Sequence, residues 1–300
     1  MNPETRNSNS RFRQLTVIGV GLIGGSLARA VRQVGLCDAI VGYGRDVGSL
    51  KNAVELGVID SYAVDLEQAV RDADLIVIAV PLGAMATVFA DMKSFLADDV
   101  IITDVGSAKQ SVISAARAAL GDRISAFVPG HPIAGTEQSG VAASFAGLYE
   151  DRRVILTPLP ENSDAMIERV RQLWQSCGAK VSCMAAGHHD EVLAATSHLP
   201  HLLAYALVDT LVCLDNSEEI FTYAAGGFRD FTRIASSDPV MWRDICLANP
   251  DAIIKVLDRF ENQLSELRNA VDQGDEVALK AFFSRAKAAR DKNVARDKNV

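Results

Sequence analysis

The stretch Gly19-Val20-Gly21-Leu22-Ile23-Gly24 decides the fold of this chain. It follows the apolar run 15–20 and opens a segment whose apolar residues recur at helical spacing as far as Gly35. The pattern G-x-G-x-x-G between a strand and a helix is typical of a phosphate-binding turn, because glycines permit the tight turn, the approach of a pyrophosphate and the packing of helix on strand. We therefore predict that Gly19, Gly21, Leu22, Ile23 and Gly24 bind a dinucleotide at a helix N-terminus.

The rest of the first half alternates short apolar runs with helical segments, which predicts βαβ units around a parallel sheet. The runs expected to be strands are 15–20, 39–43, 75–80, 100–104, 125–128, 154–157 and 180–184. Val80 and Pro81, at the end of the run 75–80, are included among the expected cofactor-binding residues. The predicted fold class of residues 1–184 is α/β, a Rossmann-type doubly wound parallel sheet.

The strand pattern stops near Ala185, and residues 185–300 are expected to form a second, all-α dimerisation domain. Helices are predicted over 188–212, 239–248, 251–273 and 276–290. Pro200 should kink the first of them, because proline lacks an amide donor and clashes with the preceding turn. Asp238 is expected to cap the second helix, and Gly274 to end the third. The residues from Ala289 onward have no apolar face and are expected to be a solvated or frayed end.

Composition limits the classes of function. With 300 residues and 49% hydrophobic content the chain is long enough for two domains, because single cores stop growing near ~250 residues. The net charge of −8 argues against nucleic acid or an anionic membrane as partner, so a small-molecule substrate is favoured. The five cysteines include no C-x-x-C pair, which favours reduced thiols and no metal site. The polar start and the lack of any ~20-residue apolar run predict a cytoplasmic location.

The choice between the two nicotinamide dinucleotides depends on residues about 20 positions beyond the glycine loop. An acidic side chain there accepts a hydrogen bond from the ribose of NAD, but this chain has Gly44 followed by Arg45. A guanidinium binds phosphate well. The sequence therefore favours NADP over NAD, with Arg45 as the binding residue. Asp46 reaching back to the ribose is the competing interpretation.

Two further segments carry the residues expected to do chemistry. One runs from Asp104 to Lys109 and the other from Gly130 to Glu137, and each follows a predicted strand. Because ligands bind at the carboxyl ends of parallel strands, Ser107 and His131 should converge near the nicotinamide. Imidazole is the usual general base near neutral pH, so His131 is the predicted base and Ser107 the residue that orients it. A purely structural histidine is the alternative.

Five blocks of the sequence resemble the prephenate and arogenate dehydrogenase family of tyrosine biosynthesis, across nearly all residues from 15 to about 285. They are Gly-Val-Gly-Leu-Ile-Gly-Gly-Ser at 19–26, Asp-Val-Gly-Ser-Ala-Lys at 104–109, His-Pro-Ile-Ala-Gly-Thr-Glu at 131–137, Ser-His-Leu-Pro-His at 197–201 and Gly-Gly-Phe-Arg-Asp-Phe-Thr-Arg-Ile-Ala at 226–235. The resemblance implies an NAD(P)-dependent oxidative decarboxylation of prephenate, L-arogenate or both, to 4-hydroxyphenylpyruvate or L-tyrosine. It implies that His131 takes the proton of the ring hydroxyl while Ser107 holds His131 and the nicotinamide in register.

The same resemblance implies the substrate-binding residues. Arg233 matches the arginine that binds the substrate carboxylate, with a surface salt bridge as the ordinary alternative. Ser197 and His201 are four positions apart on a helix and share a face, whereas His198 points about 100° away from Ser197. The resemblance places Ser197 and His201 near the substrate's side chain, with His201 a candidate sensor of tyrosine. A helix-face hydrogen bond without catalytic consequence is the alternative.

The polar cluster His188-His189-Asp190-Glu191 is interpreted as a helix start rather than a metal site, because no further ligands occur nearby at helical spacing. The apolar residues of 251–273 and 276–290 exceed what a small domain covers, so a homodimer through these helices is expected, as the resemblance also implies.

Two rival functions stay open. One is another two-domain hydroxyacid or imine dehydrogenase, against which the absence of lysine between Lys180 and Lys255 counts. The other is a non-catalytic module that senses dinucleotides. The sequence does not decide between prephenate and arogenate, or whether tyrosine inhibits.

Overall fold

The computed structural model describes residues 11–297, with side chains as far as residue 294. The chain divides after Pro250 into two compact units. The first contains both sheets and most of the helices, and the second consists of a pair of long helices. The predicted domain boundary after residue 184 stays a prediction.

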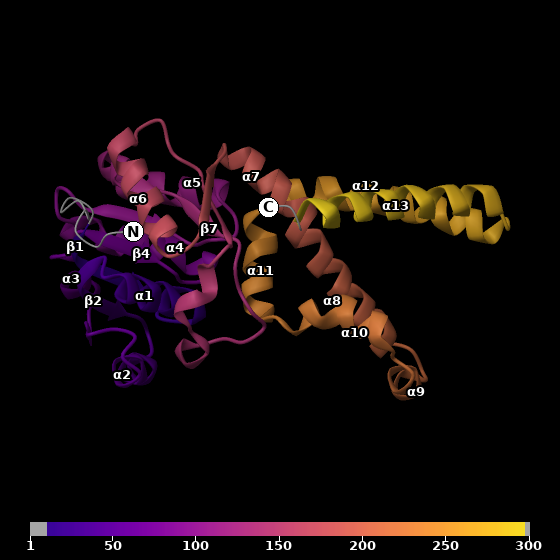
Figure 1. Cartoon of the computed structure of the whole chain (residues 1–300), viewed down its shortest axis with the longest axis horizontal. Helices are drawn as coiled ribbons and strands as arrows, with labels where there is room; N and C mark the ends of the chain where they lie inside the picture. Colours follow the sequence, from indigo (N-terminus) through magenta and orange to yellow (C-terminus); the bar gives the residue numbers. More distant parts are fainter. Residues whose placement is uncertain (1–10, 298–300) are drawn as a thin grey trace. The chain divides into compact units, whose positions relative to one another are not determined.

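A six-stranded parallel sheet, of which β1, β2 and β4 are labelled in Figure 1, forms the centre of the first unit. Its strand order is β3-β2-β1-β4-β5-β6. Its strands are β1 (Phe12–Ile18), β2 (Cys37–Tyr43), β3 (Ser61–Tyr62), β4 (Leu75–Ile78), β5 (Ile101–Asp104) and β6 (Phe127–Val128). This is the strand order of dinucleotide-binding Rossmann folds, whose winding direction reverses between β1 and β4. The predicted α/β fold class is therefore confirmed.

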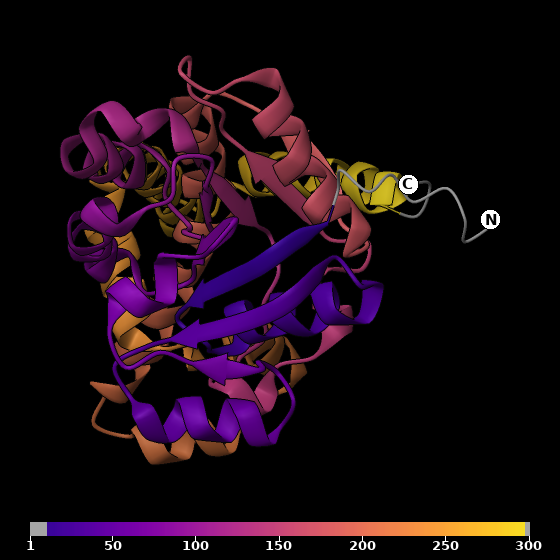
Figure 2. The same cartoon turned by 90° about the vertical axis from the view of Figure 1, so that its left-hand side faces the viewer.

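Helices cover both faces of this sheet, because its strands alternate between two apolar cores (Figure 2). Leu75 and Val77 of β4 belong to one core, together with residues of α1 and α6, whereas Ile76 and Ile78 belong to the other, with α4 and α5. The helices of this part are α1 (Leu22–Val34), α2 (Val47–Glu55), α3 (Leu66–Val70), α4 (Leu82–Met92), α5 (Gln110–Leu120) and α6 (Asp164–Ser176). Burial on both faces explains why the strands read as continuous apolar runs.

A second, three-stranded sheet corrects one part of the sequence prediction. The runs 154–157 and 180–184 were expected in the parallel sheet, but they form β8 (Arg153–Leu156) and β9 (Lys180–Cys183) of a separate sheet with β7 (Gly130–Pro132). β7 pairs with β8 in antiparallel fashion, and β8 pairs with β9 in parallel. An apolar run predicts a buried strand but not its partner. β3 and β7 were missed because they are too short to show a pattern.

Of the remaining helices of the first unit, those within 186–212 and 239–248 were predicted, whereas the two short helices between them were not. The segment predicted as one kinked helix consists of α7 (Ala186–Leu193), a π-helical turn (Ala194–His198) and α8 (Leu199–Val212). Pro200 lies in the first turn of α8, directly after the wider turn, which explains the predicted irregularity. α9 (Ser217–Thr222), α10 (Gly226–Thr232) and α11 (Pro239–Ala248) follow. Asp238 caps α11 as predicted, accepting hydrogen bonds from the amides of Val240 and Met241.

The second unit is made of α12 (Pro250–Asp272) and α13 (Glu276–Asp297), joined by a turn in which Gly274 has a φ of 62°. The end expected from Ala289 to be solvated or frayed is solvated, because residues 289–293 are exposed, but it is not frayed as far as Asp297, because the helix continues through these residues. Alanine, lysine and arginine favour helix without a buried face, and Lys287 forms an ion pair with Asp291 one turn later. Residues 298–300 of that expected end lie outside the described part. No helix of the described chain has the length and apolar character that crossing a membrane requires.

Candidate active site

The glycine loop has the geometry that a dinucleotide needs. Gly19 has a φ of 98°, and a Cβ there would lie 2.5 Å from the carbonyl oxygen of Ala79, so only glycine fits. A Cβ on Gly24 would lie 2.3 Å from the carbonyl oxygen of Gly19, which explains the close packing of α1 on the loop. A Cβ on Gly21, in contrast, would meet nothing within 4 Å. Gly21 is therefore the position where a ligand can approach the backbone, next to the N-terminus of α1.

Leu22 and Ile23 begin α1 behind this loop. Leu22 is buried in the core, and the carbonyl oxygen of Ile23 accepts a hydrogen bond from the Tyr149 hydroxyl at 2.6 Å. Val80 and Pro81 follow β4, beside β1 in the sheet, and the Ala79 amide donates to the Ile18 carbonyl at 2.7 Å. The structure thus brings the predicted cofactor-binding segments 19–24 and 80–81 to the same edge of the sheet.

The residues that would read the cofactor's ribose follow β2. Asp46 caps α2 by accepting hydrogen bonds from the Gly48 amide at 2.9 Å and the Ser49 hydroxyl at 2.6 Å. These hydrogen bonds hold the pKa of Asp46 below its usual value. Arg45 is exposed and forms no ion pair with any described residue. The Asp46 carboxylate is already engaged, whereas the Arg45 guanidinium is available to a ligand.

Asp244 of α11 ties the helical part to the cofactor edge of the sheet. Its carboxylate accepts a hydrogen bond from the Gly83 amide at 3.2 Å, in the first turn of α4. The N-cap of that helix, Pro81, supplies no side-chain cap of its own. A Cβ on Gly83 would lie 2.8 Å from the Asp244 carboxylate, so the glycine makes this approach possible. Asp244 therefore caps α4 from a distant part of the chain.

His131 lies on β7, opposite Ile155 of β8, rather than in the loop that the sequence predicted. A strand gives it a more rigid backbone than a loop would. Its Nδ1 is 2.8 Å from Nε2 of His189 on α7, and Nδ1 of His189 is 2.8 Å from a carboxylate oxygen of Asp190. His131 is 7% exposed, whereas His189 is fully buried. The two imidazoles and the carboxylate form one continuous hydrogen-bonded chain.

The charge state of His131 follows from its surroundings. Burial lowers the pKa of His131 well below its usual value, and the neighbouring His189, Lys109 and His198 lower it further. The imidazole is therefore neutral at physiological pH and is able to accept a proton. Neutral imidazole is the form that a general base requires.

A buried ion pair connects the strand that carries His131 to the end of β5. Lys109 and Asp104 are both fully buried, with the ammonium 2.5 Å from the carboxylate. Lys109 also donates to the Gly130 carbonyl at 2.7 Å, and Asp104 accepts from the amides of Gly106 at 2.8 Å and Gly130 at 3.0 Å. The pair therefore fixes the loop that contains Ser107 against the start of β7.

Ser107 is half-buried in this loop, and its backbone contacts the His198 imidazole. Among the described residues, the group that contacts Nδ1 of His131 is His189 and not the Ser107 hydroxyl. The predicted part of Ser107 in orienting His131 stays a prediction.

The predicted pair Ser197 and His201 is close in the structure, through the backbone of Ser197. Nδ1 of His201 is 2.9 Å from the Ser197 carbonyl oxygen, and its ring stacks on Trp242 with centroids 3.8 Å apart. His198, which the sequence set aside, is only 1% exposed and lies edge-on to the same tryptophan. Burial lowers the pKa of His198 to about 4. Trp242 and His198 thus form the buried wall against which His201 packs.

Arg233 is exposed over 63% of its side chain and forms an ion pair with Glu137. Glu137 follows the strand of His131 by a few residues, so the pair brings the segment 233–236 next to the loop after β7. Arg233 thus forms the surface salt bridge that was the alternative interpretation, on the side of the fold that carries His131, and its part in substrate binding stays a prediction.

Sequence reasoning missed His189, Asp190, Lys109 and Asp104. His189 and Asp190 were interpreted as part of a helix start, and the available signal, a histidine next to an aspartate, does not reveal burial against a distant strand. Lys109 and Asp104 lay inside a quoted motif, but charged residues are ordinarily exposed.

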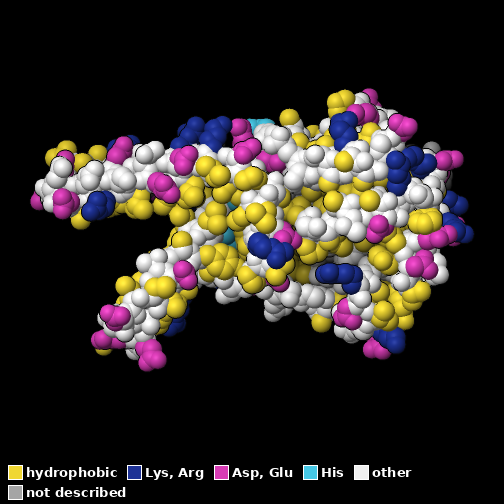
Figure 3. All heavy atoms as spheres, turned by 180° about the vertical axis from the view of Figure 1, so that it is seen from behind, with side chains coloured by type: hydrophobic (Ala, Val, Ile, Leu, Met, Phe, Trp, Pro, Cys, Tyr) yellow, Lys and Arg dark blue, Asp and Glu magenta, His cyan; other side chains and the backbone are white. Residues whose placement is uncertain are grey.

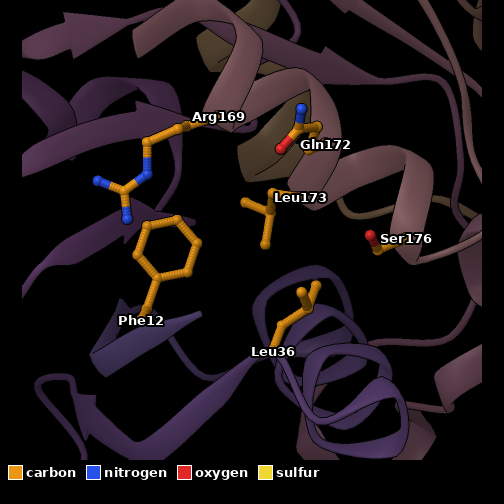
Figure 4. A pocket seen from close by; sticks show the side chains of 6 residues that line it. All are labelled: Phe12, Leu36, Arg169, Gln172, Leu173 and Ser176. Atoms are coloured by element: carbon orange, nitrogen blue, oxygen red, sulfur yellow. The ribbon is translucent and has the colours of Figure 1, made fainter. Parts of the chain in front are cut away.

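A separate pocket of about 170 Å³ lies far from these residues (Figure 4). Phe12, Leu36, Arg169 and Leu173 are among its lining residues, and the Arg169 guanidinium lies 4.6 Å from the centre of the Phe12 ring. Phe12 begins β1, whereas the glycine loop follows the other end of that strand. The pocket is therefore not the cofactor site.

The fold and the site together define a class of protein. A Rossmann sheet with a glycine loop open to phosphate, and a buried neutral histidine at the same edge, is the arrangement of a nicotinamide-dinucleotide-dependent oxidoreductase.

Comparisons with known proteins identify the family. Residues 27–183 match the nucleotide-binding domain of prephenate dehydrogenase, and residues 185–285 match its dimerization domain. A cyclohexadienyl dehydrogenase of Zymomonas mobilis is 40% identical over 93% of this chain and 95% of its own length, and a prephenate dehydrogenase of Bacillus subtilis is 37% identical over 92% and 75%. The crystal structure of Aquifex aeolicus prephenate dehydrogenase with hydroxyphenyl propionate and NAD+ has a TM-score of 0.87 at 37% identity, covering 93% of this chain and 98% of that one. This chain belongs to the prephenate dehydrogenase family and is an enzyme of that class.

Proposed function

We propose that this enzyme oxidatively decarboxylates prephenate, L-arogenate or both, giving 4-hydroxyphenylpyruvate or L-tyrosine, with His131 as the general base. The observation that carries the proposal is the neutral, nearly buried His131, fixed by Lys109 and Asp104 to the edge of the sheet where the glycine loop lies. The named activities of the relatives from Zymomonas mobilis and Bacillus subtilis support the substrate class.

The residues at this edge fit a nicotinamide dinucleotide. The open space at Gly21 and the N-terminus of α1 suit its pyrophosphate, and Val80 and Pro81 lie beside them. When bound, the nicotinamide supplies the acceptor for a hydride. We propose NADP as the preferred form, because Arg45 is exposed and the Asp46 carboxylate is engaged in capping α2. NAD is the alternative, and the Aquifex aeolicus structure contains it.

The proposed reaction requires few catalytic groups from the protein. His131 takes the proton of the ring hydroxyl while a hydride leaves the same ring carbon. The bond to the ring carboxylate then breaks, carbon dioxide departs, and the electron pair of that bond enters the ring. The phenolic oxygen of the aromatic product recovers the proton. Because aromatisation makes the carboxylate loss favourable, positioning and one proton acceptor account for most of what the site supplies.

Substrate binding is assigned to residues of the helical part. Arg233 offers an exposed guanidinium that suits a carboxylate bidentately. His201, stacked on Trp242, and Ser197, whose carbonyl oxygen contacts His201, are assigned to the substrate's side chain. Ser107 is assigned to the nicotinamide and the ring hydroxyl.

The test is a four-way assay of prephenate and L-arogenate against NAD and NADP, following nicotinamide absorbance. We expect turnover with at least one substrate, and a loss of about 10²- to 10⁴-fold in kcat for His131→Asn. His188→Gln, an exposed histidine on α7, is the matched control and should keep full activity. Absence of turnover with both substrates would refute the proposed activity, and a fully active His131→Asn variant would refute the role of His131 as general base.

The cofactor assignment has its own test. Arg45→Ala should raise the KM for NADP and leave the KM for NAD nearly unchanged, because only the 2′-phosphate uses the guanidinium. Equal effects on both cofactors would exclude Arg45 as the selecting residue.

We further propose a homodimer formed through α12 and α13, in the cytoplasm. The match to a dimerization domain supports the dimer, as do exposed apolar side chains on these helices (Figure 3). They include Ile254, Leu264, Val271, Val277 and Phe283. Light scattering should give twice the chain mass of 32.2 kDa, and Leu264→Asp with Phe283→Asp should give the monomer.

A further inference from the structure

We propose that His189 and Asp190 are positioning residues that fix the tautomer of His131, with the proton on Nδ1 and the lone pair on Nε2. This inference rests on the proposed role of His131 as base, and it names Nε2 as the atom that accepts the substrate's proton.

Asp190 is a residue of α7, and its carboxylate lies at the N-terminus of α5. Its Oδ1 accepts from the Lys109 amide at 2.8 Å, and its Oδ2 accepts from the Gln110 amide at 2.9 Å. The first amides of a helix have no partner within the helix, and the helix dipole favours a negative charge beside them. Burial opposes the charge of this carboxylate, but the hydrogen bonds from His189 and the two amides outweigh burial and hold the pKa of Asp190 below its usual value. Asp190 is therefore ionised and only accepts hydrogen bonds.

The direction of the next hydrogen bond follows. Because the Asp190 carboxylate has no proton to give, Nδ1 of His189 donates to it across 2.8 Å. In the tautomer assigned here His189 carries one proton, on Nδ1, so its Nε2 has a lone pair and accepts. The only partner described for that nitrogen is Nδ1 of His131, at 2.8 Å, which must therefore donate. His131 is left with its lone pair on Nε2.

The backbone around the pair keeps this chain in place. Asn249, nearly buried, donates from its side-chain amide to the Asp190 carbonyl at 2.9 Å and so holds the second half of α7. His131 is held on its own side by the pairing of β7 with β8. The two imidazoles thus come from separately fixed elements, which keeps Nδ1 of His131 facing Nε2 of His189.

The experiment measures the tautomer directly. Two-bond 1H–15N correlation spectra of the full chain labelled with 15N-histidine distinguish a protonated ring nitrogen from a bare one. His131→Asn assigns the His131 signals by their loss. We expect Nδ1 of His131 to be protonated and Nε2 bare near pH 7.5. A proton on Nε2 of His131 or an imidazolium at His189 would overturn the proposal.

His189→Phe tests the consequence. Without the acceptor, His131 should move toward the Nε2-protonated form that free imidazole prefers, and kcat should fall about 10²- to 10⁴-fold with little change in the KM for the cofactor. His188→Gln should change neither the spectrum of His131 nor kcat. An unchanged kcat in His189→Phe would refute the positioning role. If the wild-type tautomer is as inferred but no substrate turns over, the proposed function fails and the tautomer assignment stands.

Discussion

Replacing Lys109 by methionine should destabilise the enzyme strongly, because it leaves the Asp104 carboxylate charged and fully buried. Among the described residues, the amides of Gly106 and Gly130 would be the donors left to that charge. Breaking a buried ion pair by removing one partner costs about 3–5 kcal/mol. For a chain of this size that corresponds to a fall in Tm of roughly 5–8 °C. Calorimetry and urea denaturation both measure the effect.

A double variant separates the charge from the packing. Asp104→Asn with Lys109→Met removes both charges at similar volume, and we expect it to recover most of the loss, to within about 1–2 kcal/mol of the wild type. Lys180→Met is the matched control: its ion pair with Asp151 is exposed, at 3.4 Å, and its loss should cost less than about 1 kcal/mol. A Lys109→Met variant as stable as Lys180→Met, or a double variant no better than the single ones, would refute the reasoning.

Three further predictions concern the cofactor edge and the buried histidines. Gly21→Ala should leave the free enzyme's stability unchanged but weaken cofactor binding at least tenfold, whereas Gly24→Ala should destabilise the fold itself. Dye binding on heating measures the stability of each variant, and cofactor titration measures its affinity. Asp244→Ala should cost about 1–2 kcal/mol and raise the KM for the cofactor, because α4 loses its cap; an unchanged Tm would contradict this. The pKa of His198 is about 4 in the folded enzyme and 6.5 in the unfolded chain, so between these pH values only the unfolded chain binds the proton. The contribution of neutral His198 to the free energy of unfolding is therefore complete above pH 6.5 and falls by about 3 kcal/mol as the pH drops to 4. His198→Phe should flatten the dependence of urea stability on pH.

The sequence alone determined the features that depend on neighbours along the chain. The order of apolar runs and helical segments indicated the Rossmann sheet, and the glycine spacing located the tight turn between β1 and α1, because a turn's backbone conformation is set by adjacent residues. Asp238 was recognised as a cap for the same reason: a cap bonds to amides two and three positions on. Asp46 also directly precedes a helix, but from the sequence it could equally bind the ribose of the cofactor. Only the observed hydrogen bonds show that its carboxylate caps α2.

Tertiary structure decided everything that joins distant segments. His131 and His189 are 58 positions apart, and Asp190 meets the start of α5 across 81 positions. No period or motif links such residues, because their meeting depends on how α7 packs against β7 and α5. The same holds for the second sheet, since an apolar run is equally buried by a parallel or an antiparallel neighbour. The sequence could single out His131 as the candidate base, but only the packing brings His189 to its Nδ1.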